Sequence, residues 1–204
     1  MPGRGWMLVA LVLAAGALLA WIQPPDVQTA MEWRPDLAWR EPWRAFTAAL
    51  LHLSPQHLIA NLAGCAVLGL LGIAGRLRSR DAIAWLLAWP LTQIGLLWEP
   101  QLLRYGGLSG VLHAGVAVAS IAMLQARHAH GRERVIGLLV GIGLLVKVAA
   151  ERPLADPPLR HWDGWNIAIA PMAHLTGLIA GASMALLCWS VCAFAARKRE
   201  PARG

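Results

Sequence analysis

Long apolar runs separated by polar connections dominate the chain. A helix needs about 17–25 mostly apolar residues to cross a bilayer, and six runs approach or exceed that length. These runs cover residues 6–22, 55–75, 82–98, 108–126, 135–150 and 167–196. The pattern predicts an all-α polytopic membrane protein with six membrane-spanning helices, folded as a single domain over residues 1–204.

The connection over residues 23–54 differs from the others in its length and its aromatic content. Four aromatic residues alternate with charged ones in it: Trp33, Trp39, Trp43 and Phe46. Such a mixture is typical of a segment that lies in the membrane interface. Ser54 followed by Pro55 is a typical helix N-cap with proline at the first helical position, so the second span is expected to begin there.

Composition excludes several other classes of protein. Hydrophobic residues make up 57% of the chain and charged residues 14%, which excludes intrinsic disorder and collagen-like structure. The net charge of +7 comes from basic residues between the apolar runs, so no nucleic-acid partner is expected. A cleaved signal peptide is an alternative interpretation of the first run, but its length and the aromatic segment after it favour a span. The chain contains 3 cysteines, and this odd number argues against a framework of disulfide bonds.

The basic residues also predict an orientation in the membrane. If the N-terminus lies inside, the inner connections and termini hold 11 Lys and Arg residues and the outer connections hold 6. The outer connections also carry most of the acidic residues. The positive-inside rule therefore places both termini in the cytoplasm. An outer aromatic belt is then expected from Trp21, Trp33, Trp39, Trp43, Trp98, Trp162 and Trp165.

Polar and ionisable residues inside spans are costly and usually mark function. They concentrate in three places, each near the outer end of a span that enters from the same side: His52 to Asn61, Tyr105 to His113, and His174 to Gly181. His57 and Asn61 are four residues apart and lie on one helix face. With a rise of about 1.5 Å per residue, they are expected to share one layer of the membrane with Ser109 and His174.

This layer has the composition of a serine-hydrolase site. Gly177 and Gly181 form a small-residue face that allows close helix packing in lipid. A serine hydroxyl next to an imidazole on a packed neighbouring helix is the arrangement that nucleophilic catalysis requires. Backbone N–H groups where the Gly-rich turn meets the helix, near Gly107 and Leu108, offer donors for an oxyanion. The histidines can alternatively be interpreted as haem ligands, but His52 and His57 sit on one helix, whereas bis-histidine ligation needs facing helices.

The motifs resemble those of the rhomboid family of intramembrane serine proteases. The resemblance runs from Trp43 to about Gly181, through His52-x4-His57-x3-Asn61, Gly107-Leu-Ser109-Gly110 and His174-x2-Gly177-x3-Gly181. It implies a rhomboid-like six-helix bundle in which Ser109 is the nucleophile and His174 the general base, a dyad with no carboxylate. It also implies an oxyanion hole formed by His57, Asn61 and the Ser109 N–H. A catalytically inactive relative that binds and escorts transmembrane segments is the alternative.

One branch of that family, the rhombosortases, is closer in several details. His113 stands four residues after the nucleophile, where other rhomboids carry an aromatic residue stacked on the base, and Lys147 with Glu151 adds to the likeness. The branch implies a protease in the bacterial inner membrane, with its active site toward the periplasm. Its substrates would be membrane-anchored proteins that carry a C-terminal tail of the Gly-Gly type.

Four further residues are candidates for modulating this site. His113 is expected to tune His174 or to replace the aromatic packing, and His52 to modulate the site. Lys147 and Glu151 form either a snorkelling interfacial pair or an electrostatic contact with a substrate tail or the gate. No cofactor and no metal are expected, because the histidines lack a carboxylate or thiolate partner at ligand spacing.

Overall fold

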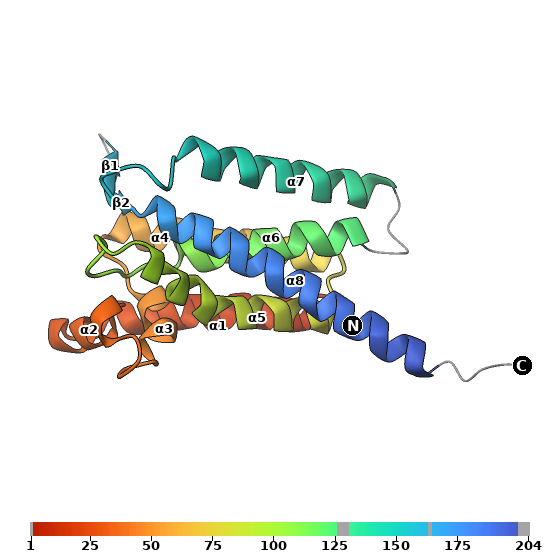
Figure 1. Cartoon of the computed structure of the whole chain (residues 1–204), viewed down its shortest axis with the longest axis horizontal. Coiled ribbons are helices and arrows are strands. Elements are labelled where there is room, and N and C mark those ends of the chain that lie inside the picture. Colours follow the sequence, from red (N-terminus) through yellow and green to blue (C-terminus); the bar gives the residue numbers. More distant parts are fainter. Residues whose placement is uncertain (1, 126–130, 163–164, 200–204) are drawn as a thin grey trace, which may run out of the picture.

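A computed structural model describes residues 2–125, 131–162 and 165–199. Six long helices run side by side in this part of the chain (Figure 1). They are α1 (Arg4–Trp21), α4 (Pro55–Ala74), α5 (Ser79–Ile94), α6 (Ser109–Gln125), α7 (Gly131–Ala150) and α8 (Pro171–Arg199). The chain is thus an all-α membrane helical bundle, as its apolar runs predict.

Shorter elements gather at the end of the bundle away from the termini (Figure 1). The long connection folds into α2 (Pro25–Met31), the 3-10 turn η1 (Pro35–Leu37), α3 (Arg44–Thr47) and η2 (Ala48–Leu50). A third 3-10 turn, η3 (Gly95–Trp98), follows α5. A small antiparallel hairpin of β1 (Arg160–Trp162) and β2 (Trp165–Ile169) joins α7 to α8.

The helix boundaries follow local signals, with one clear departure from the expected ones. The Ser54 side chain accepts a hydrogen bond from the His57 N–H at 3.2 Å, so the predicted cap of α4 is confirmed. The sixth helix was expected from residue 167 but begins at Pro171, because residues 165–169 pair with β1 instead. Residue 126, the predicted end of the fourth span, lies outside the described residues.

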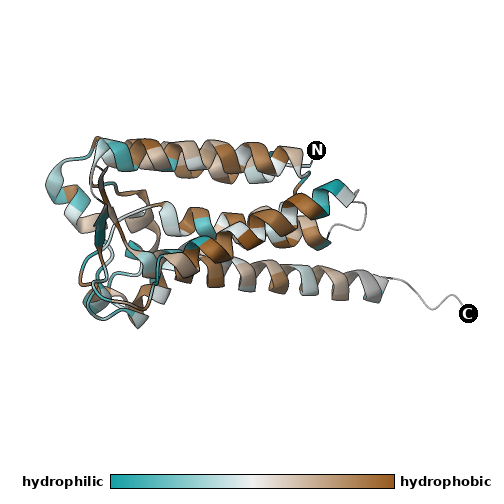
Figure 2. Ribbon diagram, turned by 90° about the horizontal axis from the view of Figure 1, so that it is seen from above, coloured by the Kyte–Doolittle hydropathy of each residue, from teal (hydrophilic) through white to brown (hydrophobic). Residues whose placement is uncertain are grey.

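The outer surface of the bundle is apolar, as a bilayer requires. Large aliphatic side chains such as Leu11, Val67 and Leu139 are exposed along the helices. Figure 2 shows hydrophobic residues along the long helices, with hydrophilic ones mainly near the helix ends and in the connections. By length and hydropathy, α1, α4 and the Pro171–Ala195 part of α8 are long and apolar enough to cross a membrane, and α6 is apolar but shorter. The expected total of six spans and their orientation stay predictions.

Tryptophans and close helix contacts fill the interior. The rings of Trp6 and Trp85 lie 4.4 Å apart, and their indole N–H groups donate to the carbonyls of Leu68 and Val111 at 2.7 and 2.8 Å. Trp33, expected in the outer aromatic belt, is instead buried, whereas Trp39 and Trp98 are exposed. The side chains of Trp162 and Trp165 lie outside the described ones.

A buried arginine ties the long connection together. The Arg44 guanidinium donates to the carbonyls of Thr29 and Glu32 at 3.1 and 2.8 Å and pairs with Glu41 at 2.5 Å. The segment therefore has a defined structure that packs against α5 and α1. Its place in the membrane interface stays a prediction.

Candidate active site

Ser109 is the first residue of α6, and a glycine turn delivers it there. The Gly107 N–H donates to the Ala48 carbonyl at 2.9 Å, which anchors the turn to η2. The Tyr105 hydroxyl donates to the Gly107 carbonyl at 3.2 Å, and burial raises the pKa of Tyr105 to about 12, so the phenol stays neutral. A Cβ on Gly106 would lie 2.8 Å from the Leu51 Cβ, so only glycine fits.

His174 faces Ser109 from the first turn of α8. Its Nε2 lies 2.9 Å from the Ser109 Oγ, so the hydroxyl and imidazole expected to be neighbours are within hydrogen-bond distance. Glycines make this approach possible, because a Cβ on Gly177 or Gly181 would overlap the backbone oxygens of Gly110 and Ala114. The small-residue face predicted on the sixth span is thus the contact surface between α8 and α6.

A carboxylate completes the other side of the imidazole. The Glu151 Oε2 lies 2.6 Å from the His174 Nδ1, so the expected dyad without a carboxylate is not what the structure contains. The Lys147 ammonium donates to Glu151 Oε1 at 2.6 Å. Burial alone would raise the pKa of the Glu151 carboxyl, but His174 and Lys147 outweigh it and lower the pKa to about 2.

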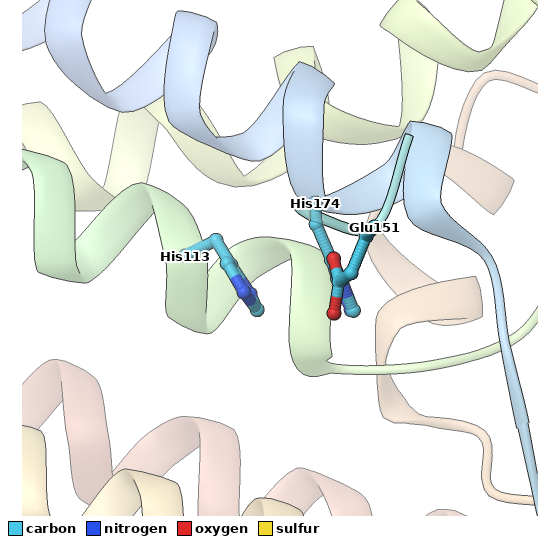
Figure 3. Close-up of side chains that lie close together, drawn as sticks. All are labelled: His113, Glu151 and His174. Atoms are coloured by element: carbon cyan, nitrogen blue, oxygen red, sulfur yellow. The ribbon is translucent and has the colours of Figure 1, made fainter. Parts of the chain in front are cut away.

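His113 occupies the place expected for a stacked aromatic ring. Its ring lies 4.0 Å from that of His174, at an interplanar angle of 12° (Figure 3). The His113 Nδ1 lies 2.6 Å from the Ser109 carbonyl oxygen. Because a carbonyl only accepts, that nitrogen carries the proton. The bond fixes the His113 ring against the face of His174.

Within the described part of the chain, two polar side chains of α4 lack partners for one nitrogen each. His57 Nδ1 and Asn61 Nδ2 are buried and have no hydrogen-bond partner among the described residues. Buried polar atoms without partners are rare and call for an explanation. The ring of His52 lies 4.9 Å from that of His57, and its Nδ1 lies 3.0 Å from the Leu50 carbonyl oxygen. Burial and the neighbouring His57 lower the pKa of His52 to about 4, so it is neutral.

These residues surround a cavity of about 490 Å³. Its walls are formed by three strand residues and eight helix or loop residues: Ile167, Ala168, Ile169, His57, Ala60, Asn61, Ser109, His113, Lys147, Glu151 and His174. Gly107 and Leu108, expected near the oxyanion, are not among the lining residues, and the Leu108 side chain is buried in the core. Any contribution from them comes through the backbone.

The donor set also bears on metal binding. Ligand atoms of His113, Glu151 and His174 all lie within 4.8 Å of one another (Figure 3), and two imidazoles with a carboxylate are a set that binds zinc. The expectation that the histidines lack a carboxylate partner is therefore wrong. However, His174 already bonds Ser109 and Glu151, and His113 bonds the Ser109 carbonyl. The absence of a metal stays a prediction.

Sequence comparison adds one finding. A family model described as the Rhomboid domain matches residues 39–191, which include every residue of the cavity. A search of curated proteins gave no significant match.

Proposed function

Because the chain belongs to the rhomboid family of intramembrane serine proteases, we propose that it cleaves membrane-anchored proteins with Ser109 as nucleophile and His174 as general base. The observation that carries the proposal is the 2.9 Å distance between Ser109 Oγ and His174 Nε2. This is the hydrogen-bond reach that proton transfer between a nucleophile and its base requires.

The reaction follows from that contact. Ser109 Oγ attacks the substrate carbonyl carbon while its proton passes to His174 Nε2, giving a tetrahedral oxyanion. The C–N bond then breaks, and His174 returns the proton to the leaving amine. Water then attacks the acyl-enzyme and loses a proton to the same nitrogen. The bond between the acyl carbon and Ser109 Oγ breaks, His174 returns the proton to Oγ, and the acid product leaves.

Three groups are suited to stabilise the oxyanion. The first N–H groups of a helix have no partner within the helix, and Ser109 is the first residue of α6. His57 and Asn61 line the same cavity with unpartnered nitrogens. Donors placed in advance at a developing negative charge are usually the largest single contribution to catalysis.

The substrate we propose is a membrane-anchored protein with a C-terminal tail of the Gly-Gly type. A transmembrane helix must unwind before its carbonyl can reach Ser109, and glycine lowers the cost of unwinding because it is a poor helix former. Resemblance to the rhombosortase branch, including His113 in place of an aromatic residue, supports this choice. The same branch and the charge pattern favour a bacterial inner membrane, cytoplasmic termini and a periplasmic active site.

A catalytically inactive escort of transmembrane segments is the rival function. Such a binder has no need for a serine hydroxyl hydrogen-bonded to a buried imidazole. The bond between Ser109 and His174 therefore favours the protease.

A fluorophosphonate probe, which reacts covalently with activated serines, tests the proposal. Purified wild-type protein is expected to be labelled, and the Ser109→Ala and His174→Ala variants are not. Ser120 bonds the Gly137 carbonyl between α6 and α7 and lies outside the cavity, so Ser120→Ala serves as the labelled control. Equal labelling of wild type and Ser109→Ala would refute the nucleophile.

The substrate class needs a separate measurement. A reporter that ends in a Gly-Gly tail, an apolar helix and a basic cluster is expected to be released from membranes that contain the wild type, but not His174→Ala. Release of the same reporter with its glycines changed to leucines, at an equal rate, would contradict the Gly-Gly preference while leaving the protease assignment intact.

A further inference from the structure

We propose that Glu151 is a positioning residue that holds His174 as the correct tautomer for proton abstraction, and that Lys147 and Arg160 hold Glu151 in place. This inference rests on the proposed function of Ser109 and His174. The end of α7 and the loop after it would then orient the base. The dyad implied by the family resemblance contains no such orienting group.

The tautomer follows from the two bonds of the imidazole. An ionised carboxylate only accepts hydrogen bonds, so the 2.6 Å contact with Glu151 Oε2 requires the proton to be on His174 Nδ1. The neutral ring then has its lone pair on Nε2, which faces Ser109 Oγ at 2.9 Å. Without the carboxylate, the proton is free to occupy Nε2, where it would block the abstraction.

The charge of Glu151 also matches the needs of the transition state. When Ser109 gives up its proton, His174 becomes a cation in a site where its side chain is only 5% exposed. A carboxylate at 2.6 Å compensates this charge, and bonds to ionised groups are among the strongest in proteins. Among the described residues, the other titratable groups that interact with His174 are His57 on α4, His113 on α6 and Lys147 on α7.

Each oxygen of Glu151 has its own partner. Oε2 meets His174 and Oε1 meets the Lys147 ammonium, both at 2.6 Å, so the carboxylate has a fixed rotation. The Lys147 side chain is 49% exposed and the Glu151 side chain 12%. Lys147 is therefore the more exposed partner of this ion pair, and both residues line the cavity.

The backbone that carries Glu151 is held by an arginine of the hairpin. Arg160 on β1 donates to the carbonyls of Glu151, Arg152 and Ala155 at 2.5, 2.9 and 2.6 Å. Arg152, two residues after the end of α7, lies in the left-handed region with φ 48°, which turns the chain after Glu151. One guanidinium thus stabilises the turn that points Glu151 toward His174.

The test measures the fluorophosphonate labelling rate of the full-length enzyme in detergent between pH 5 and 9. Glu151→Gln keeps the shape but loses the charge and is expected to slow labelling about 10- to 100-fold. Its acidic limb, where the rate falls as the base becomes protonated, moves to lower pH because the imidazolium loses its counter-charge. Glu151→Asp keeps the charge and is expected to recover part of the wild-type labelling rate and to bring the acidic limb back toward its wild-type pH.

Lys147→Met is a second variant, and its acidic limb is expected to shift in the opposite direction to that of Glu151→Gln. Arg160 and His174 still hold Glu151 in this variant, so the carboxylate stays in place while a cation near His174 is removed. The acidic limb is therefore expected to move to higher pH. A merely structural role would lower thermal stability in either variant without moving the two limbs in opposite directions. Glu99→Gln, at the same end of the molecule but outside the cavity, is the matched control and is expected to behave as wild type.

The outcomes separate the two proposals. If Ser109→Ala is labelled like the wild type, the proposed function fails. If Ser109→Ala is silent but Glu151→Gln matches the wild type in rate and acidic limb, only the positioning role is overturned. If Glu151→Gln does not fold, an acidic limb that stays unmoved in Lys147→Met overturns it.

Discussion

The seam between α6 and α8 and the attachment of α7 are built in different ways. At the seam, Gly177 and Gly181 allow backbone-to-backbone contact, and Ser109 and His174 lie at the end where both helices begin. Helix α7 packs chiefly against α6, and in it only Gly137, Leu144 and Val148 are buried. Figure 1 shows α7 at the edge of the bundle.

The two regions would then serve two different requirements of the proposed site. One is the distance between Ser109 and His174, and the other is the orientation of the His174 ring. The proposed nucleophile and base need a short, fixed distance, and close packing of α6 and α8 brings them to 2.9 Å. Glu151, which we propose orients the base, comes from the end of the most lightly packed long helix. Its position depends on individual polar bonds, those of Lys147, Arg160 and His174, rather than on packing. The seam should therefore be sensitive to volume and the α7 end to charge.

A methyl group added at the seam gives the largest expected effect. Gly177→Ala would place a Cβ on the Gly110 backbone oxygen, so α8 must move away from α6. A displacement of about 1 Å in a catalytic group can cost about 100-fold in rate, and overpacking costs about 1–3 kcal/mol of stability. Labelling is expected to fall at least that far, with a lower melting temperature.

The same substitution in α7 is the matched control. A Cβ on Gly143 would meet no atom within 4 Å, so Gly143→Ala is expected to label within about twofold of wild type. Its melting temperature should be unchanged or slightly raised, because alanine favours the helix by about 1 kcal/mol over glycine. Equal damage from both alanines would remove the distinction between the two regions.

Charge at the α7 end is tested by Arg160→Met, with a smaller expected effect. The variant loses three hydrogen bonds to carbonyls of the turn, each contributing about 0.5–1.5 kcal/mol. Labelling is expected to slow about 3- to 10-fold, with an acidic limb displaced in the direction of Glu151→Gln.

Arg104→Met is the control for Arg160→Met. Arg104 lies in the connection between η3 and α6, at the same end of the bundle, and forms an exposed salt bridge with Glu32. Such pairs contribute about 0–1 kcal/mol, so this control is expected to keep the wild-type rate and acidic limb. An equal loss in both variants would point to a general effect of removing surface charge.

The sequence predicted much of the fold because helix signals are local. The apolar runs locate all six long helices, and Ser54 and Pro55 define the start of α4. The neighbourhood of Ser109 and His174 was predictable too, since both residues lie at helix starts on the same side and glycines mark the contact.

The misses depend on contacts between distant segments. Glu151 lies 23 residues before His174 in the chain, and only its i,i+4 relation to Lys147 is visible locally. Arg160 gave no signal, because its three carbonyl partners are set by the shape of a turn. The hairpin replaced the expected start of the last helix since strand pairing outweighed the apolar run there. Trp33 is buried in a cluster that includes Tyr105, a residue far from it in the chain with which its backbone also pairs.

The smallest expected effect concerns stability in acid. The ordinary pKa of the Glu151 carboxyl is 4.5, and the folded protein lowers it to about 2. A carboxyl with a lowered pKa contributes stability that is complete above its ordinary value and is lost as pH falls toward the folded value. The melting temperature of wild type should therefore exceed that of Glu151→Gln by a constant few degrees above about pH 5.5. The gap should close between about pH 4.5 and pH 2. If the difference in melting temperature persists at pH 2, the charge of the Glu151 carboxylate is not what stabilises the contact between the end of α7 and His174.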